Sequence, residues 1–185
     1  MITPFTSSTQ GKESWVKPEF NLLLQQLIRE ILLVLDQPEY SADMLSAVTC
    51  ETAKEPPSDP SLTHLLPPMS TDIEEAARMR ALTDDFLRSE KSERLRAIHE
   101  ELERAYEGGG RVVIAAEKEW EWLAALNDLR LALGGELGLE TDEDAEGLLA
   151  LAQGEVPDSA GRAVNATAYL LVTWWQDSLL SSMRS

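Results

Sequence analysis

Few side chains suited to metal binding are present, and none lies in a complete motif. His99 stands in HEELE, which begins like the zinc-protease motif HExxH, but the fifth position is Glu103. The residue three positions before His99 is Arg96, where a carboxylate-bridged metal bundle needs a glutamate. The other histidine is His64 and the single cysteine is Cys50. We therefore expect His99 to lie at the edge of the core and the protein to bind no metal.

Residues 142–147 resemble the opening of a twelve-residue calcium-binding loop. Asp142, Asp144 and Glu146 alternate, but the twelfth position is Gln153, where a calcium loop needs a bidentate glutamate. Thr141 followed by Asp144 also has the spacing of a capped helix N-terminus. The same residues therefore predict the start of a helix better than a calcium site.

Motifs for nucleophilic catalysis or phosphate binding are missing from the sequence. There is no G-x-S-x-G, and the glycine run at 108–110 precedes a predicted strand instead of following one, which indicates a turn. Cys50 has no basic neighbour closer than Lys54, so its thiol is a weak nucleophile. We expect that the protein is not an enzyme and holds no cofactor.

Arg130 is the most unusual polar residue of the sequence, because a helical wheel places it on an apolar stripe with Leu123, Leu126, Leu133 and Leu137. An arginine is almost never buried without a partner. Asp177 lies at the border of the apolar face of the last helix, so we expect Arg130 to pair with it and Asn127 to supply a further hydrogen bond. Glu30 is the alternative partner. Whether this buried polar cluster is structural or a functional site stays open.

Trp174 and Trp175 are a second candidate site, for a partner protein. Adjacent residues of a helix point about 100° apart, so the last helix could bury one indole and expose the other. The alternative is that both indoles belong to the core.

Periodicity and capping residues predict a mainly α fold, a single-domain helical bundle of residues 1–185 around a hydrophobic first helix, with a minor two-stranded β element. The first helix, 20–35, carries four polar residues at its middle and is too short to span a membrane. Gly134, Gly135 and Gly138 are expected to close the fourth helix, and Ser70 or Thr71 to cap the long one. The other predicted helices are 71–107, 117–137, 141–153 and 161–183, and the first of these is expected to be bent or broken near 88–91. Strands are predicted at 14–17 and 111–114.

Residues 37–61 lack periodicity and are rich in proline, so we expect an exposed, partly disordered connection with a short helix at 40–48 as an option. The next segment, SLTHLLPPMS, predicts a docking segment that Pro67 ends. Its anchors are expected to be Leu62, Leu65 and Leu66.

Charge and the N-terminal sequence limit the partners and the compartment. The chain has 16 Lys and Arg against 33 Asp and Glu, a formal charge of −17, which repels phosphate backbones and anionic membranes. We therefore expect no membrane association and consider nucleic-acid binding unfavourable. The start MITPFTSSTQGK lacks the features of a signal peptide, and one cysteine allows no internal disulfide, so we expect a cytoplasmic protein.

The basic residues are concentrated in one region, since seven of the 16 lie between residues 78 and 104. Acidic residues are interleaved three or four positions away, as Glu74 is from Arg78 and Glu90 from Arg94. Such spacing favours a solvated face with ion pairs over a surface for nucleic acid.

Several segments together resemble a known family. These are the D-P-x-L-x-x-L-L-P segment from Asp59 to Pro67, the glycine turn into RVVI, the run WLAALNDLRLALGGELG, and the terminal Y-x-x-x-x-W-W-Q-D-S-L. They resemble an actinobacterial family of uncharacterised proteins, a domain-of-unknown-function family often encoded beside the Clp protease adaptor. The resemblance implies a compact helical protein in a setting of regulated proteolysis, and it supplies no catalytic residues.

Three classes of function follow from these observations. The first is a non-catalytic interaction or adaptor protein, linked to Clp-dependent proteolysis, with a protein partner or self-association. The second is a DNA-binding transcriptional regulator that uses the arginine-bearing helices at 71–107 and the strand pair as a wing. The third is an enzyme of unrecognised type.

Overall fold

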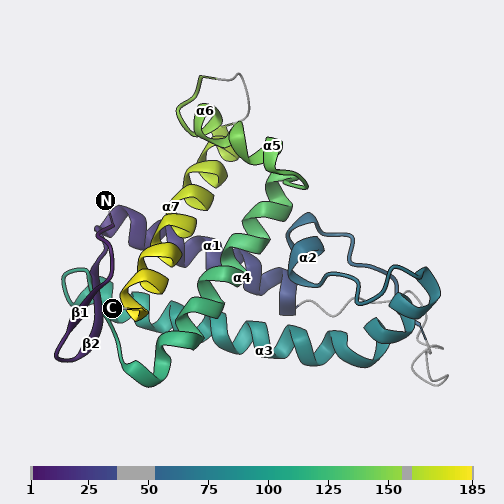
Figure 1. The fold of residues 1–185 in the computed structure, drawn as a ribbon, viewed down its shortest axis with the longest axis horizontal. Helices are drawn as coiled ribbons and strands as arrows, with labels where there is room; N and C mark the ends of the chain where they lie inside the picture. The colour runs from purple at the N-terminus through teal and green to yellow at the C-terminus, as the bar shows by residue number, and fades with distance from the viewer. Residues whose placement is uncertain (1, 37–52, 156–159, 185) are drawn as a thin grey trace.

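The computed structural model describes residues 2–36, 53–155 and 160–184, and it shows a mainly α single domain (Figure 1). The predicted fold class is confirmed. Most of the predicted connection at 37–61, including the optional helix at 40–48, lies outside the described residues. The helices are α1 (Pro18–Asp36), α2 (Pro60–Leu65), α3 (Ile73–Glu107), α4 (Glu119–Leu137), α5 (Asp142–Glu146), α6 (Leu148–Ala152) and α7 (Ala160–Met183).

The β element is a three-stranded antiparallel sheet of β1 (Thr6–Ser8), β2 (Gly11–Trp15) and β3 (Arg111–Ile114), in that order. The predicted pairing of the N-terminal strand with the middle of the chain is present, with Ser14 opposite Val112. The additional strand is β1, which pairs with β2. Its sequence, TSS, is polar and fully exposed, so it has no alternation of apolar residues from which a strand could be predicted.

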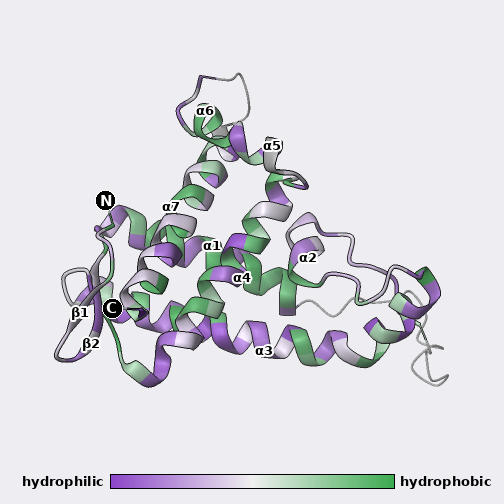
Figure 2. Ribbon diagram, in the orientation of Figure 1, coloured by the Kyte–Doolittle hydropathy of each residue, from purple (hydrophilic) through white to green (hydrophobic). Residues whose placement is uncertain are grey.

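The centre of the bundle is α4 rather than the first helix. It packs against α1, α2, α3 and α7, whereas α1 leaves Leu22 and Leu33 exposed to solvent. Figure 1 shows α4 and α7 side by side, with α3 running along the edge of the molecule beneath them. Figure 2 shows α4 mostly hydrophobic and α3 mostly hydrophilic, with short hydrophobic turns. Among the described residues no helix has the length and hydropathy needed to cross a membrane.

The glycines of α4 have a different role from the predicted one. Gly134 and Gly135 are buried inside the helix, which continues to Leu137 and ends on Gly138 in the left-handed conformation, φ 67°. Without side chains, they let α2 and α7 approach the backbone of α4 closely. The three predicted docking leucines of the α2 segment, Leu62, Leu65 and Leu66, are all buried.

The long helix α3 is not broken at 88–91. Arg88 and Ser92 are buried there, and both bond to the C-terminal turn of α1. Apolar residues pause because polar side chains occupy the buried face. The N-cap is Asp72, one residue after the predicted Thr71, and its side chain accepts a hydrogen bond from the Glu75 amide.

The predicted acidic helix after Thr141 forms as two short helices, α5 and α6, separated at Gly147. Thr141 and Asp144 form the capping box. The second of the two helices, α6, forms a second small apolar cluster with the C-terminal end of α4 and the N-terminal half of α7. Asp144, one of the three acidic residues considered for a calcium loop, therefore caps a helix.

Candidate functional site

The structure does not bring Arg130 and Asp177 together. Arg130 is half-buried and donates a hydrogen bond to Asn127 Oδ1 at 3.0 Å, while Asp177 is exposed and no ion pair joins these two described residues. Glu30, the alternative partner, is also exposed and accepts from Gln26. The physical reason is the rotation of α7, which presents Gln176 to α4 and turns Asp177 toward solvent.

The buried acid of α4 is Asp128, which sequence reasoning missed. Its carboxylate lies 2.6 Å from Lys91 Nζ and 2.5 Å from Arg94 Nη1, and both cations come from α3. Asp128 is only 2% exposed, so this ion triad joins α3 to α4 at the edge of the core. A helical wheel would have found it, because Asp128 lies on the same stripe as Ala125 and Ala132.

The two tryptophans of α7 point in different directions. Trp175 is fully buried, stacks on Phe5 with ring centres 4.9 Å apart, and donates its indole N–H to Ser14 Oγ at 2.9 Å. Trp122 meets it edge-on. Trp174 is partly exposed. Trp175 is therefore a core residue that ties the sheet to α7, and Trp174 is the indole that could contact a partner.

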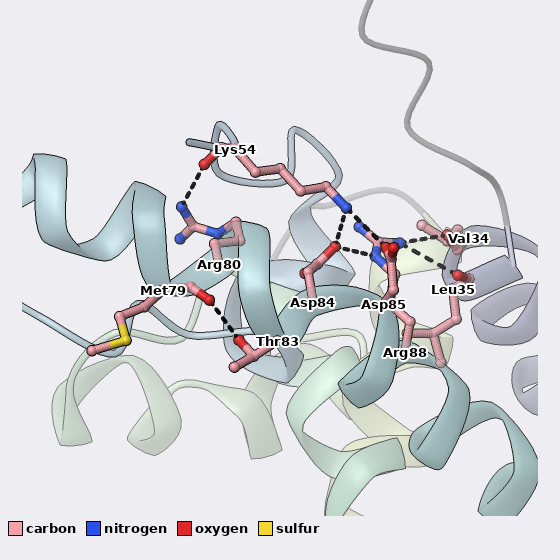
Figure 3. A network of polar contacts seen from close by, with 9 residues as sticks. All are labelled: Val34, Leu35, Lys54, Met79, Arg80, Thr83, Asp84, Asp85 and Arg88. Carbon is pink, nitrogen blue, oxygen red and sulfur yellow. Dashed lines mark hydrogen bonds and ion pairs between the residues drawn. The ribbon is translucent and has the colours of Figure 1, made fainter. Parts of the chain in front are cut away.

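A network of polar contacts fixes the first half of α3 (Figure 3). Asp84 is buried and accepts from Lys54 Nζ at 2.5 Å and from Arg88 Nε at 2.7 Å. Arg88 also donates to the Val34 and Leu35 carbonyls, at 3.3 and 3.4 Å, which lie in the last turn of α1. Burial alone would raise the pKa of Asp84, but the hydrogen bonds and charges of Lys54 and Arg88 hold it below its ordinary value.

Lys54 belongs to the segment before α2, which runs beside the first half of α3. Its amide donates to the Ala77 carbonyl at 3.0 Å, and its own carbonyl accepts from Arg80 at 3.3 Å. Figure 3 shows Lys54 lying across Arg80 and Asp84. The segment and the helix are thus held together along about two helical turns.

The basic residues of α3 mostly serve internal contacts. Six of the seven between 78 and 104 contact acceptors of this chain within the described residues, and Arg78 is exposed. Arg96, for example, bonds to Asp36 of α1. The remaining contacts are those of Arg80, Arg88, Lys91, Arg94 and Arg104.

The side of α3 that faces away from α1 and α4 presents large apolar side chains to solvent. Met79, Leu82 and Phe86 have helical spacing of i, i+3 and i+7, which places them within about 60° of one another. Their exposed fractions are 40%, 80% and 64%. We call these three residues the α3 face. Soluble proteins seldom leave such a stripe uncovered without a use for it.

An open groove of about 630 Å³ adjoins the α3 face. Its walls are the segment at Glu55 and Pro56, the loop before α3 and the first turns of α3. Met69 connects the two surfaces, because it lines the groove and its sulfur lies 3.8 Å from Thr83 Oγ1, which is bonded to the Met79 carbonyl. Met69 therefore places one edge of the groove beside the α3 face.

Acidic side chains surround the α3 face. Glu75, Asp85, Glu90 and Glu93 are exposed on the same part of the helix, against Arg78 as the exposed base. Among the described residues, no group of histidine, cysteine and carboxylate side chains is arranged to hold a metal ion. The arrangement is suited to contact with another macromolecule through apolar anchors inside a negative rim.

Comparison with known proteins identifies the family but no characterised relative. No curated protein and no solved structure matches the chain. The model of a family described as a domain of unknown function, DUF2017, matches residues 2–183. This chain therefore belongs to the DUF2017 family, an uncharacterised domain-of-unknown-function family.

Proposed function

We propose that this protein is a non-catalytic interaction protein, an adaptor that binds a partner protein through the α3 face. The observation that carries the proposal is the exposure of Met79, Leu82 and Phe86 at helical spacing on a fixed helix. Helical stripes of this kind are a common recognition element between proteins. Methionine in the stripe adds an adaptable contact.

The anchoring of α3 supports the proposal energetically. Asp84, Arg88 and Lys54 hold the first half of the helix against α1 and the adjoining segment. A surface that is rigid before binding loses little conformational entropy when a partner arrives. The partner therefore meets a preformed face.

The DNA-binding alternative gains no support from this arrangement, because most basic side chains of α3 are paired with acceptors of this chain. Trp174 stays part of our proposal as a second, smaller contact for the partner. By the resemblance to a family encoded beside the Clp adaptor, we propose that the protein acts in the cytoplasm in Clp-dependent proteolysis.

Site-specific photo-crosslinking tests this proposal. A photoreactive phenylalanine analogue is placed at Leu82, and in a matched control at Leu33, which is also a leucine, 66% exposed, on the outer side of α1. In the source cell, crosslinks to one defined protein should form from position 82 and not from 33. Equal crosslinking from both positions, or none from 82, would overturn the proposal.

A further inference from the structure

We infer that the occupant of the α3 face is a cationic amphipathic helix of the partner protein. This inference rests on the proposed function and adds the chemical class of the partner segment. Two observations support it: the spacing of the three apolar side chains and the negative sign of the charges around them.

The shape of the surface favours a helix. Met79, Leu82 and Phe86 cover about 10 Å along the axis of α3, or two turns, at 1.5 Å per residue. A partner helix packed against α3 would place its own i, i+3 or i+4, and i+7 residues over such a stripe. The groove beside Met69 extends the apolar area for one further anchor.

The charge of the rim selects a basic segment. Glu75 precedes the stripe and Glu90 and Glu93 follow it, while Asp85 lies at its border and also contacts Lys54 Nζ at 3.4 Å; all four are exposed. Lysine or arginine side chains that flank the apolar anchors of a partner helix would meet these carboxylates. Such charges raise the association rate and exclude acidic competitors more than they add affinity.

The same charges disfavour a second copy of this chain as the occupant. Two α3 faces in contact would bring like rims together, and each chain carries a formal charge of −17. An anionic membrane surface is disfavoured for the same reason. A basic protein segment is the class that satisfies both the apolar stripe and the rim.

Binding of a designed peptide tests the inference on the intact chain. The probe is a labelled helix of about 18 residues, with leucine at the anchor positions and lysine elsewhere, and its counterpart carries glutamate in place of lysine. Fluorescence anisotropy should show binding of the lysine peptide and no binding of the glutamate peptide.

The variant Leu82→Glu distinguishes binding through the apolar stripe from general attraction to the negative charge of the protein. It adds a negative charge, so binding by general electrostatic attraction would become tighter, whereas loss of the apolar anchor should weaken binding about tenfold. Leu33→Glu adds the same charge on α1 and should leave the affinity unchanged. Because Leu82 is 80% exposed, the fold does not depend on it, and Phe86→Ser provides a second, charge-free test.

The double variant Glu90→Lys with Glu93→Lys tests the rim and should weaken binding of the lysine peptide. Equal binding of both peptides, or undiminished binding to Leu82→Glu, would overturn the inference. If position 82 crosslinks to a partner but the lysine peptide does not bind, the proposed function stands and the class of occupant is wrong. If the peptide binds and no crosslink forms in cells, the inference about chemistry holds and the proposed function fails.

Discussion

Gly135 of α4 lies directly against Pro60 of α2, so closely that a Cβ atom on residue 135 would be 2.1 Å from the Pro60 carbonyl oxygen. The two residues belong to two of the sequence segments that carry the family resemblance, WLAALNDLRLALGGELG and D-P-x-L-x-x-L-L-P. They are the two halves of one helix–helix contact. This contact explains why a glycine stands inside a buried helix, where it would otherwise be unfavourable.

Substitution of the two neighbouring glycines should have opposite effects. Gly135→Ala should lower the free energy of unfolding by about 2 kcal/mol, because the methyl group meets backbone atoms that cannot move aside. Gly134→Ala places its methyl group at 3.4 Å from His64 Nδ1, an ordinary contact. Because alanine has a higher helix propensity than glycine, Gly134→Ala should leave the stability unchanged or raise it by up to about 1 kcal/mol. Urea denaturation of both variants checks this; equal loss in both would contradict the backbone clash.

Asp128→Asn should destabilise the protein by about 3 kcal/mol, because it leaves two cations of α3 without their shared carboxylate. The control is Asp177→Asn on α7, which changes the same chemical group at an exposed position and should leave the melting temperature unchanged. Thermal melts followed by circular dichroism measure both. A large loss of stability with Asp177→Asn would instead favour the pairing of Asp177 with Arg130.

The contribution of Asp84 should depend on pH. Its pKa lies below the ordinary 3.8, so the stabilisation is fully present above that pH and is lost as the pH falls through the lowered pKa. Asp84→Asn should therefore cost about 3 kcal/mol at neutral pH, and the cost should shrink below pH 3.8. Denaturation series at several pH values test this. A cost that stays constant with pH would show that the charge of Asp84 is not involved.

The pH dependence of stability that Glu136 causes should have the opposite sign to that of Asp84. Partial desolvation at the helix surface, with the negative charges of Asp59 and Glu30, raises the pKa of its carboxyl above the ordinary 4.5. The ionised form is thus unfavourable in the folded state, and stability falls as the pH rises through 4.5 and above. Glu136→Gln should raise the melting temperature slightly at neutral pH and lose this advantage under acidic conditions. Glu155→Gln, at an exposed loop position, is the matched control and should change nothing at either pH.

Local sequence determined most of the helices and their order. Apolar periodicity and capping residues such as Thr141 act over a few neighbours, so they locate α1, α4 and α7 without knowledge of the fold. The pairing of β2 with β3 was inferred by a different route, because the sequence offered one plausible partner for the strand at 111–114. The adjacent positions of Trp174 and Trp175 likewise determined that one indole could point inward while the other faced solvent.

Tertiary structure decided which polar residue is buried and which partner it finds. Arg130 and Asp128 both interrupt an apolar sequence, but the side of α4 that meets α3 and the rotation of α7 choose Asp128 for an ion triad and leave Asp177 in solvent. The exposure of Met79, Leu82 and Phe86 was also decided there. A periodic apolar stripe looks the same in sequence whether a neighbouring helix covers it or not, and only the packing of α3 against α1 and α4 shows that its other side is open.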